Sequence, residues 1–231
     1  MMLICISGVD GAGKSTQLAL LDRYLRFKGL KTYQLWLRWF SIFTYFLYFY
    51  ARLVKRTVVV ETRSRPVHVH IFWVDKALQR LYPRVLLLDL LLWFFVKKFV
   101  AWVKRVDVML IDRSFLDAVV DLLWEVRDVG FLRSIVGRVI WRVISSMKVL
   151  ILIIEPKEAV KRKSDIVSLR KMAFEKRCFE ILAKHLSIPI LNTTGIDIII
   201  TFRELLKVLE VSWCLSPQNA ANLPVHPIAS S

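Results

Sequence analysis

One short segment constrains this chain more than any other. Residues 8–15 read GVDGAGKS and match the pattern G-x-x-x-x-G-K-[ST] in full. An apolar run at 2–7 precedes the segment, as expected of a buried parallel strand, and apolar residues recur at helical spacing over 14–28. A strand, a glycine-rich turn and a helix in this order let successive backbone N–H groups surround a phosphate at a helix N-terminus. The sequence therefore predicts a phosphate-binding loop, and a chance glycine-rich turn is the weaker interpretation.

The residue types within this loop predict a nucleoside triphosphate and its metal ion as ligands. The glycines permit positive φ angles and a close approach of the backbone to phosphate oxygens. Lys14 is expected to bridge the β- and γ-phosphates of ATP, and the Ser15 hydroxyl to bind Mg²⁺. The predicted ATP-binding set is Gly8, Gly11, Ala12, Gly13, Lys14, Ser15 and Thr16.

A second anchor follows the apolar run at 106–111, which ends in Asp112 and Arg113. An acidic residue beside the loop can hold Mg²⁺, and a basic one can bind the phosphate of an acceptor. Asp112 could instead cap the helix expected from about residue 116, a role for which Ser114 competes. The sequence has no N/T-K-x-D signature for reading guanine, so a phosphotransferase is favoured over a GTPase.

The order of the predicted elements indicates the fold class. Short apolar strands alternate with helical stretches, which is typical of a parallel sheet covered on both faces. We expect a three-layer α/β/α P-loop NTPase fold with a doubly wound parallel sheet of about five strands. We expect one kinase domain at 1–211. Residues 212–231 contain no charged side chain and three of the seven prolines, and are expected to form a flexible tail.

Composition adds limits on partners and location. The formal net charge of +16 favours anionic partners, and three widely spaced cysteines favour a reducing cytoplasm over a disulfide framework or zinc site. Two apolar blocks, 39–54 and 85–103, are interrupted by charged residues, so no integral membrane span is expected. The blocks are expected to add core, with a dimer surface or an altered acceptor pocket as the alternatives.

The sequence GVDGAGKST, together with DRSFLD and the basic helix after ILIIEP, resembles the thymidylate kinase family of nucleoside monophosphate kinases. The resemblance runs from residue 2 to about 210 and is weakest at 39–105. It implies ATP-dependent phosphorylation of dTMP to dTDP with Mg²⁺, in a homodimer. Nucleic acid is not expected as a partner, because the basic residues are scattered through the helices rather than gathered in one motif.

The resemblance also implies an acceptor site. Asp10 corresponds to the residue that contacts the acceptor sugar, and Arg38 and Arg113 to those that bind its phosphate. Phe72 matches the aromatic residue that stacks on thymine. Lys76 stands where the family usually has arginine, which keeps the charge but loses the bidentate geometry.

The family's catalytic arginine lies in the phosphate loop or in a lid. Loop positions 9–12 contain no arginine, so the resemblance assigns this role to a lid near 157–170, with Arg162 the best match and Arg170 the alternate. A solvated helix face is an equally good explanation of this basic run. The predicted catalytic residues are thus Lys14, Asp112 and Arg162.

Two other functions remain compatible with the sequence. One is a different P-loop nucleotide or nucleoside kinase. The other is a non-catalytic ATP-binding protein that uses the positive charge and the aromatic block to hold a membrane surface or nucleic acid.

Overall fold

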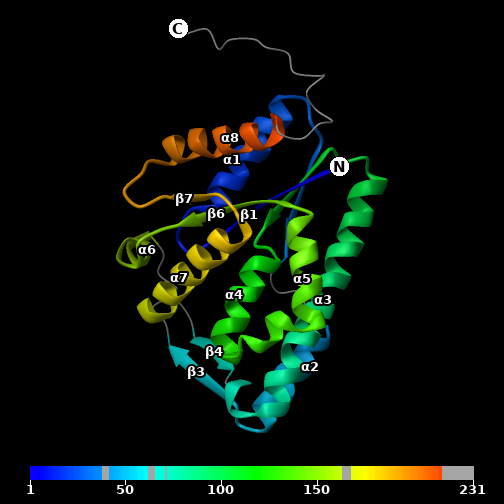
Figure 1. Cartoon of the computed structure of the whole chain (residues 1–231), viewed down its shortest axis with the longest axis vertical. Helices are drawn as coiled ribbons and strands as arrows, with labels where there is room; N and C mark the ends of the chain where they lie inside the picture. The colour runs from blue at the N-terminus through cyan, green and yellow to red at the C-terminus, as the bar shows by residue number, and fades with distance from the viewer. Residues whose placement is uncertain (38–41, 62–65, 71, 163–167, 215–231) are drawn as a thin grey trace.

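The computed structural model describes residues 1–37, 42–61, 66–70, 72–162 and 168–214, and its helices cover both faces of a central sheet (Figure 1). The predicted sites at Arg38 and in the stretch 163–167 of the lid fall outside the described residues. The sheet consists of five parallel strands in the order β2-β5-β1-β6-β7. Its strands are β1 (Met2–Gly8), β2 (Thr32–Trp36), β5 (Val108–Asp112), β6 (Lys148–Ile153) and β7 (Ile190–Asn192). The predicted three-layer fold with a parallel sheet is confirmed.

The three central strands are apolar except near their ends, because helices cover them on both sides. Ile4, Leu110 and Leu152 are each no more than 1% exposed. On one face lie α1 (Lys14–Phe27) and α8 (Ile198–Cys214); on the other lie α4 (Phe115–Val126), α5 (Ile135–Ser145) and α7 (Leu169–Leu186) (Figure 1). A strand with no solvent-facing side has no polar alternation, and this is the pattern that the sequence displays.

Several helix ends follow the local chemistry of the sequence. Helix α1 ends just before Gly29, which has a φ of 80°. Pro156 opens α6 (Pro156–Arg162), where its missing N–H costs nothing. Before α5 the chain forms a separate 3₁₀ turn, η2 (Gly130–Arg133). The Ser134 hydroxyl accepts a hydrogen bond from Gly137 N and so caps α5.

The region between β2 and β5 extends away from the sheet (Figure 1). It contains α2 (Phe43–Leu53), the antiparallel pair β3 (Thr57–Glu61) and β4 (Pro66–His70), the 3₁₀ turn η1 (Phe72–Val74) and the long helix α3 (Lys76–Val103). In the described part of the chain, none of the helices combines the length and apolar character needed to cross a membrane.

The expectation that the aromatic block adds core is wrong for most of α2. Phe46, Phe49 and Tyr45 are more than 60% exposed, and only Thr44 and Ala51 are fully buried in this helix. The helix contacts its neighbours along one narrow stripe, so most of its aromatic side chains face outward.

Candidate nucleotide-binding site

The phosphate loop lies between the end of β1 and the start of α1, as predicted. Gly8 has a φ of 134°, and a Cβ atom there would lie 1.9 Å from the carbonyl oxygen of Leu152 on β6. Gly13 precedes α1 in the left-handed conformation, and no side chain caps the helix. The first turn of α1 therefore presents uncapped backbone N–H groups and the positive end of its dipole to the loop.

Lys14 lies beneath the loop rather than in solvent. Its Nζ atom donates hydrogen bonds to the carbonyl oxygens of Gly8 and Val9 at 2.7 and 2.9 Å, and contacts Asp10 Oδ1 at 3.4 Å. Burial lowers the pKa of this ammonium group, and the nearby positive charge of Arg113 lowers it further. An anionic ligand would oppose both effects.

Ser15 and Asp112 meet at the mouth of the loop although 97 residues separate them in the sequence. The Ser15 hydroxyl donates to Asp112 Oδ2 at 2.7 Å. The other carboxylate oxygen, Asp112 Oδ1, is buried and has no hydrogen-bond partner among the described residues. One hydroxyl and one unpartnered carboxylate oxygen are hard oxygen donors of the kind Mg²⁺ prefers, so these residues fit that ion.

Ser114, and not Asp112, caps helix α4. Its hydroxyl accepts from Leu116 N at 3.0 Å, and Asp117 Oδ2 accepts from Ser114 N at 2.8 Å. This capping box resolves the competition noted above and leaves the Asp112 side chain turned toward Ser15.

Asp10 and Arg113 form an ion pair at the edge of the same loop. The Arg113 backbone has a φ of 61°, an unfavourable angle for a residue with a Cβ atom. This conformation ends β5 abruptly and allows the guanidinium group to reach back over the loop toward Asp10. Two residues assigned to the acceptor by resemblance thus lie together beside Lys14.

A cavity of about 590 Å³ opens in front of the loop. Residues from the loop, the end of β5, α6 and the segment after β7 line it, including Lys14, Ser15, Arg113, Arg162 and Asp197. Arg162 faces this cavity because two contacts hold it: an ion pair with Glu158 and a hydrogen bond of 3.2 Å to the Thr193 carbonyl. Glu158 also accepts from Gly195 N at 2.9 Å, which ties α6 to the segment after β7.

The structure gives Phe72 a different place from the one the resemblance implied. Its ring is fully buried and stacks on Tyr82 at a centroid distance of 4.1 Å, with Tyr48 of α2 beside it at 6.1 Å. Tyr48 belongs to the apolar block 39–54 and to α2, and Tyr82 belongs to α3. Phe72 therefore packs between these two helices and does not line the cavity. Lys76 is exposed at the start of α3 and also does not line it.

Two residues that help to form the site were not predicted from the sequence. Asp117 is buried, accepts a hydrogen bond from Gly8 N at 3.3 Å and so joins α4 to the loop; burial raises the pKa of its carboxyl group. The signal was present as the S-x-x-D pattern of a capping box. Gln17 donates to the carbonyl oxygen of Ile198 at 2.9 Å and closes the cavity wall, a long-range contact that no local pattern indicates.

The fold and loop together define the class: this is the three-layer fold of the P-loop NTPases. Among solved structures, a thymidylate kinase from Candida albicans aligns over 91% of this chain and 92% of its own, with a TM-score of 0.55 and 19% identity. A thymidylate kinase from Ehrlichia chaffeensis aligns over 90% and 98%, with a TM-score of 0.46 and 17% identity. No family model and no curated protein sequence matches the chain. At this identity the likeness to the Candida enzyme establishes a shared fold.

Proposed function

We propose that this protein transfers the γ-phosphoryl group of ATP to a nucleoside monophosphate, with dTMP as the favoured acceptor. The observation that carries the proposal is the contact between Ser15 and Asp112 at the mouth of a complete phosphate loop. It joins a metal-binding hydroxyl to a carboxylate with one unpartnered oxygen, beside a buried lysine.

The loop residues would bind and orient the triphosphate. Backbone N–H groups from Gly11 to Thr16 would donate to phosphate oxygens, and the Lys14 ammonium group would leave its carbonyl partners for the β- and γ-phosphates. Ser15 and Asp112 would hold Mg²⁺, which when bound neutralises charge on the phosphates. Arg162, at the far wall of the cavity, would stabilise negative charge on the transferring group.

The acceptor would bind next to the Asp10–Arg113 pair. The Arg113 guanidinium group can bind the acceptor phosphate, and Asp10 can accept a hydrogen bond from a sugar hydroxyl. The preference for dTMP rests on the likeness of the fold to a thymidylate kinase, because the Phe72 ring is covered by Tyr82.

A panel of acceptors tests the proposal. We would measure kcat/KM for dTMP, dUMP, dCMP, dAMP and dGMP, and for thymidine, with ATP and Mg²⁺. The proposal expects dTMP to be the best substrate. Preference for a purine or cytosine monophosphate would change the acceptor, activity on thymidine alone would indicate a nucleoside kinase, and no transfer to any of them would refute the proposal.

Arg113 offers a sharper test of the acceptor site within the same assay. Arg113→Ala should lower kcat/KM for the monophosphate by about a thousandfold, because a phosphate in the site would lose its charged partner. Arg105→Ala is the matched control, because Arg105 also has a left-handed backbone with a φ of 52° but lies at the exposed end of α3. Equal losses in both variants would place the effect in the backbone rather than in phosphate binding.

A further inference from the structure

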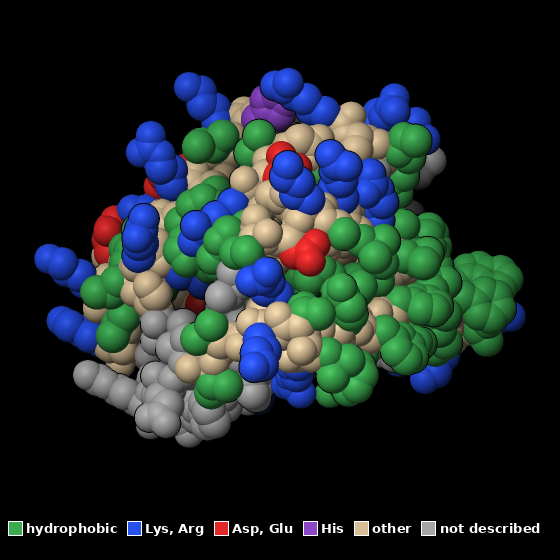
Figure 2. All heavy atoms as spheres, turned by 90° about the horizontal axis from the view of Figure 1, so that it is seen from below, with side chains coloured by type: hydrophobic (Ala, Val, Ile, Leu, Met, Phe, Trp, Pro, Cys, Tyr) green, Lys and Arg blue, Asp and Glu red, His purple; other side chains and the backbone are tan. Residues whose placement is uncertain are grey.

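Exposed hydrophobic side chains are concentrated on two helices. Among the described residues, 14 of the 30 exposed large hydrophobic side chains belong to α2 and α3. Figure 2 shows hydrophobic side chains gathered over one side of the molecule, the side on which Figure 1 places α3. Single exposed apolar residues are ordinary, but a gathering of this size marks a surface that contacts something apolar.

Helix α2 is fixed with its aromatic side outward. Asp89 of α3 is buried and accepts hydrogen bonds from the backbone N–H groups of Phe43 and Thr44 and from the Thr44 hydroxyl, at 3.1, 2.7 and 2.6 Å. The inner stripe of α2 is thereby held on α3. The outer residues, Phe43, Tyr45, Phe46, Phe49, Tyr50 and Leu53, are left exposed.

Helix α3 continues this surface. Phe95, Phe99 and Trp102 recur at helical spacing and are exposed by 55, 62 and 67%. The Lys97 ammonium group lies over the Trp93 ring, with its Nζ atom 4.2 Å from the ring centroid, so a positive charge sits directly beside these aromatic side chains. We call the exposed hydrophobic residues of α2 and α3 the aromatic face.

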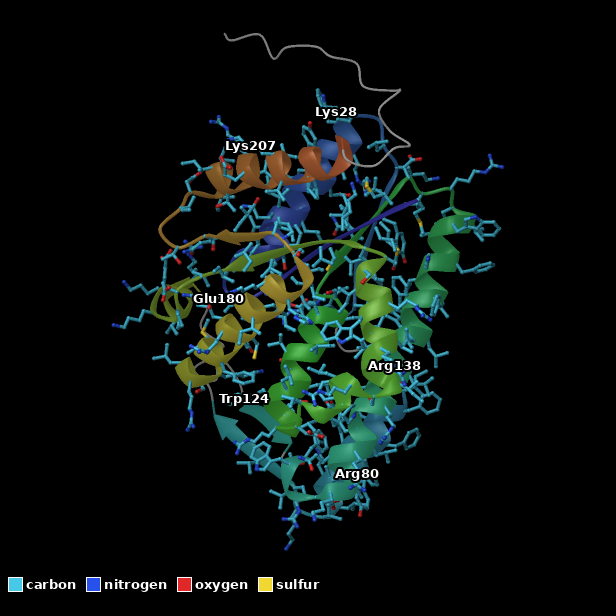
Figure 3. The ribbon with its side chains drawn as sticks, viewed as in Figure 1. Lys28, Arg80, Trp124, Arg138, Glu180 and Lys207 are labelled. Atoms are coloured by element: carbon cyan, nitrogen blue, oxygen red, sulfur yellow. The ribbon has the colours of Figure 1, made fainter. Side chains whose placement is uncertain are left out.

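The charges around the aromatic face are mostly positive, with the exposed Asp107 just after the end of α3. Residues 42–59 and 76–106 contain ten lysines and arginines and a single acidic residue, the buried Asp89. Figure 3 shows Arg80 at the lower end of the molecule and the exposed Glu180 across the fold, on α7. Aromatic side chains flanked by many cations and few exposed carboxylates match the boundary between the headgroups and acyl chains of an anionic bilayer.

We propose that the aromatic face docks on an anionic lipid surface, with the aromatic side chains in the interface and the lysines and arginines on the lipid phosphates. A second copy of the chain is a poorer occupant, because a symmetric interface would bring the same ten positive charges together from each side. The cavity-lining helix α6 lies on the opposite side of the molecule from α3 (Figure 1), so a docked molecule would keep its nucleotide site in solvent.

Flotation of the full chain with lipid vesicles tests this proposal. The probes are vesicles of phosphatidylcholine alone and of phosphatidylcholine mixed with phosphatidylglycerol, at low and high salt. The wild-type protein should float with the anionic vesicles, less so at high salt, and much more weakly with the neutral ones. Failure to float with anionic vesicles, or equal flotation with neutral vesicles, would overturn the proposal.

A pair of variants assigns the binding to this surface. Phe46→Asp combined with Phe49→Asp should lower vesicle partitioning by about 100-fold, because two rings leave the interface. Phe27→Asp combined with Ile181→Asp makes the same change in charge at exposed positions outside the aromatic face, and should lower partitioning by no more than about threefold. Equal losses in the two double variants would overturn the assignment.

Sedimentation velocity of the same proteins distinguishes the alternative occupant. All variants should show the circular dichroism of the wild type, since every substituted side chain is more than half exposed. A concentration-dependent dimer that Phe46→Asp with Phe49→Asp abolishes, in a protein that does not bind vesicles, would overturn the lipid proposal in favour of a second copy.

Discussion

At the scale of single residues, the environment of Lys14 affects both its charge and its binding of phosphate. The ammonium group is buried against two carbonyl oxygens, with Arg113 close enough to disfavour its charge. Burial and this repulsion lower the pKa below 10.5. The folded protein therefore binds fewer protons at Lys14 than the unfolded chain between the lowered pKa and 10.5, and this group's contribution to the unfolding free energy rises with pH across that window.

Binding of ATP should restore the charge on Lys14. In that same window the phosphates raise the pKa of the ammonium group, so we expect ATP binding to take up as much as one proton. Calorimetric titrations in two buffers of different ionisation enthalpy, repeated at a series of pH values up to 10.5, would measure the uptake. Lys14→Arg is the control, because a guanidinium group stays protonated; the same uptake in that variant would rule out Lys14 as the source.

Gly8 tests the close approach of the loop to β6. A Cβ atom at this position would meet the Leu152 carbonyl oxygen at 1.9 Å, at a φ of 134°. We expect Gly8→Ala to lower the free energy of unfolding by about 3 kcal/mol or more in urea titrations. Gly29→Ala, with a positive φ but nothing within 4 Å, should cost only about 1 kcal/mol. Similar losses would mean that the backbone angle, rather than the contact with β6, restricts Gly8.

At the scale of elements, buried or partly buried carboxylates join helices to neighbouring parts of the fold. Asp117 ties α4 to the first residue of the loop, Glu158 ties α6 to the segment after β7, and Asp89 ties α2 to α3. In each case a carboxylate accepts hydrogen bonds from backbone N–H groups that would otherwise lack a partner at a helix end or turn.

The attachment of α2 can be tested at Asp89. Asp89→Ala leaves the buried N–H and hydroxyl groups of Thr44 without their acceptor, and should lower the free energy of unfolding by about 3 kcal/mol. Hydrogen exchange of the α2 amides should accelerate more than that of β1. Glu204→Ala removes an exposed ion pair with Lys207 and should change stability by about 0.5 kcal/mol or less. Unchanged exchange in α2 after Asp89→Ala would show that side-chain packing alone holds the helix.

The elements that local chemistry determines were the ones predictable from sequence. The loop, its flanking strand and helix, and the five-stranded sheet follow from glycine spacing and apolar runs. Phe72 could not be placed in this way, because a resemblance of motif does not show that Tyr48 and Tyr82 cover the ring. The exposed side of α2 was also missed, since a helix with six aromatic residues among eleven has no polar stripe to indicate which side faces solvent.

At the scale of the whole molecule, two chemically different surfaces lie on opposite sides of one fold. One side carries the phosphate loop, the cavity and Arg162. The other carries α3 and the apolar side chains of the aromatic face (Figures 1 and 2). The net charge of +16 serves both proposed roles, because nucleotides and anionic lipids each present phosphates.

The central claim is that the loop around Lys14 transfers a phosphoryl group. The most direct measurement follows the radiolabelled γ-phosphate of ATP onto dTMP, with the products separated by chromatography, for the wild-type protein and for Lys14→Ala. The account predicts labelled dTDP from the wild type and a loss of about a thousandfold or more in Lys14→Ala, with the wild-type circular dichroism retained. Equal transfer by a folded Lys14→Ala protein, or no labelled product from the wild type with any monophosphate, would contradict it.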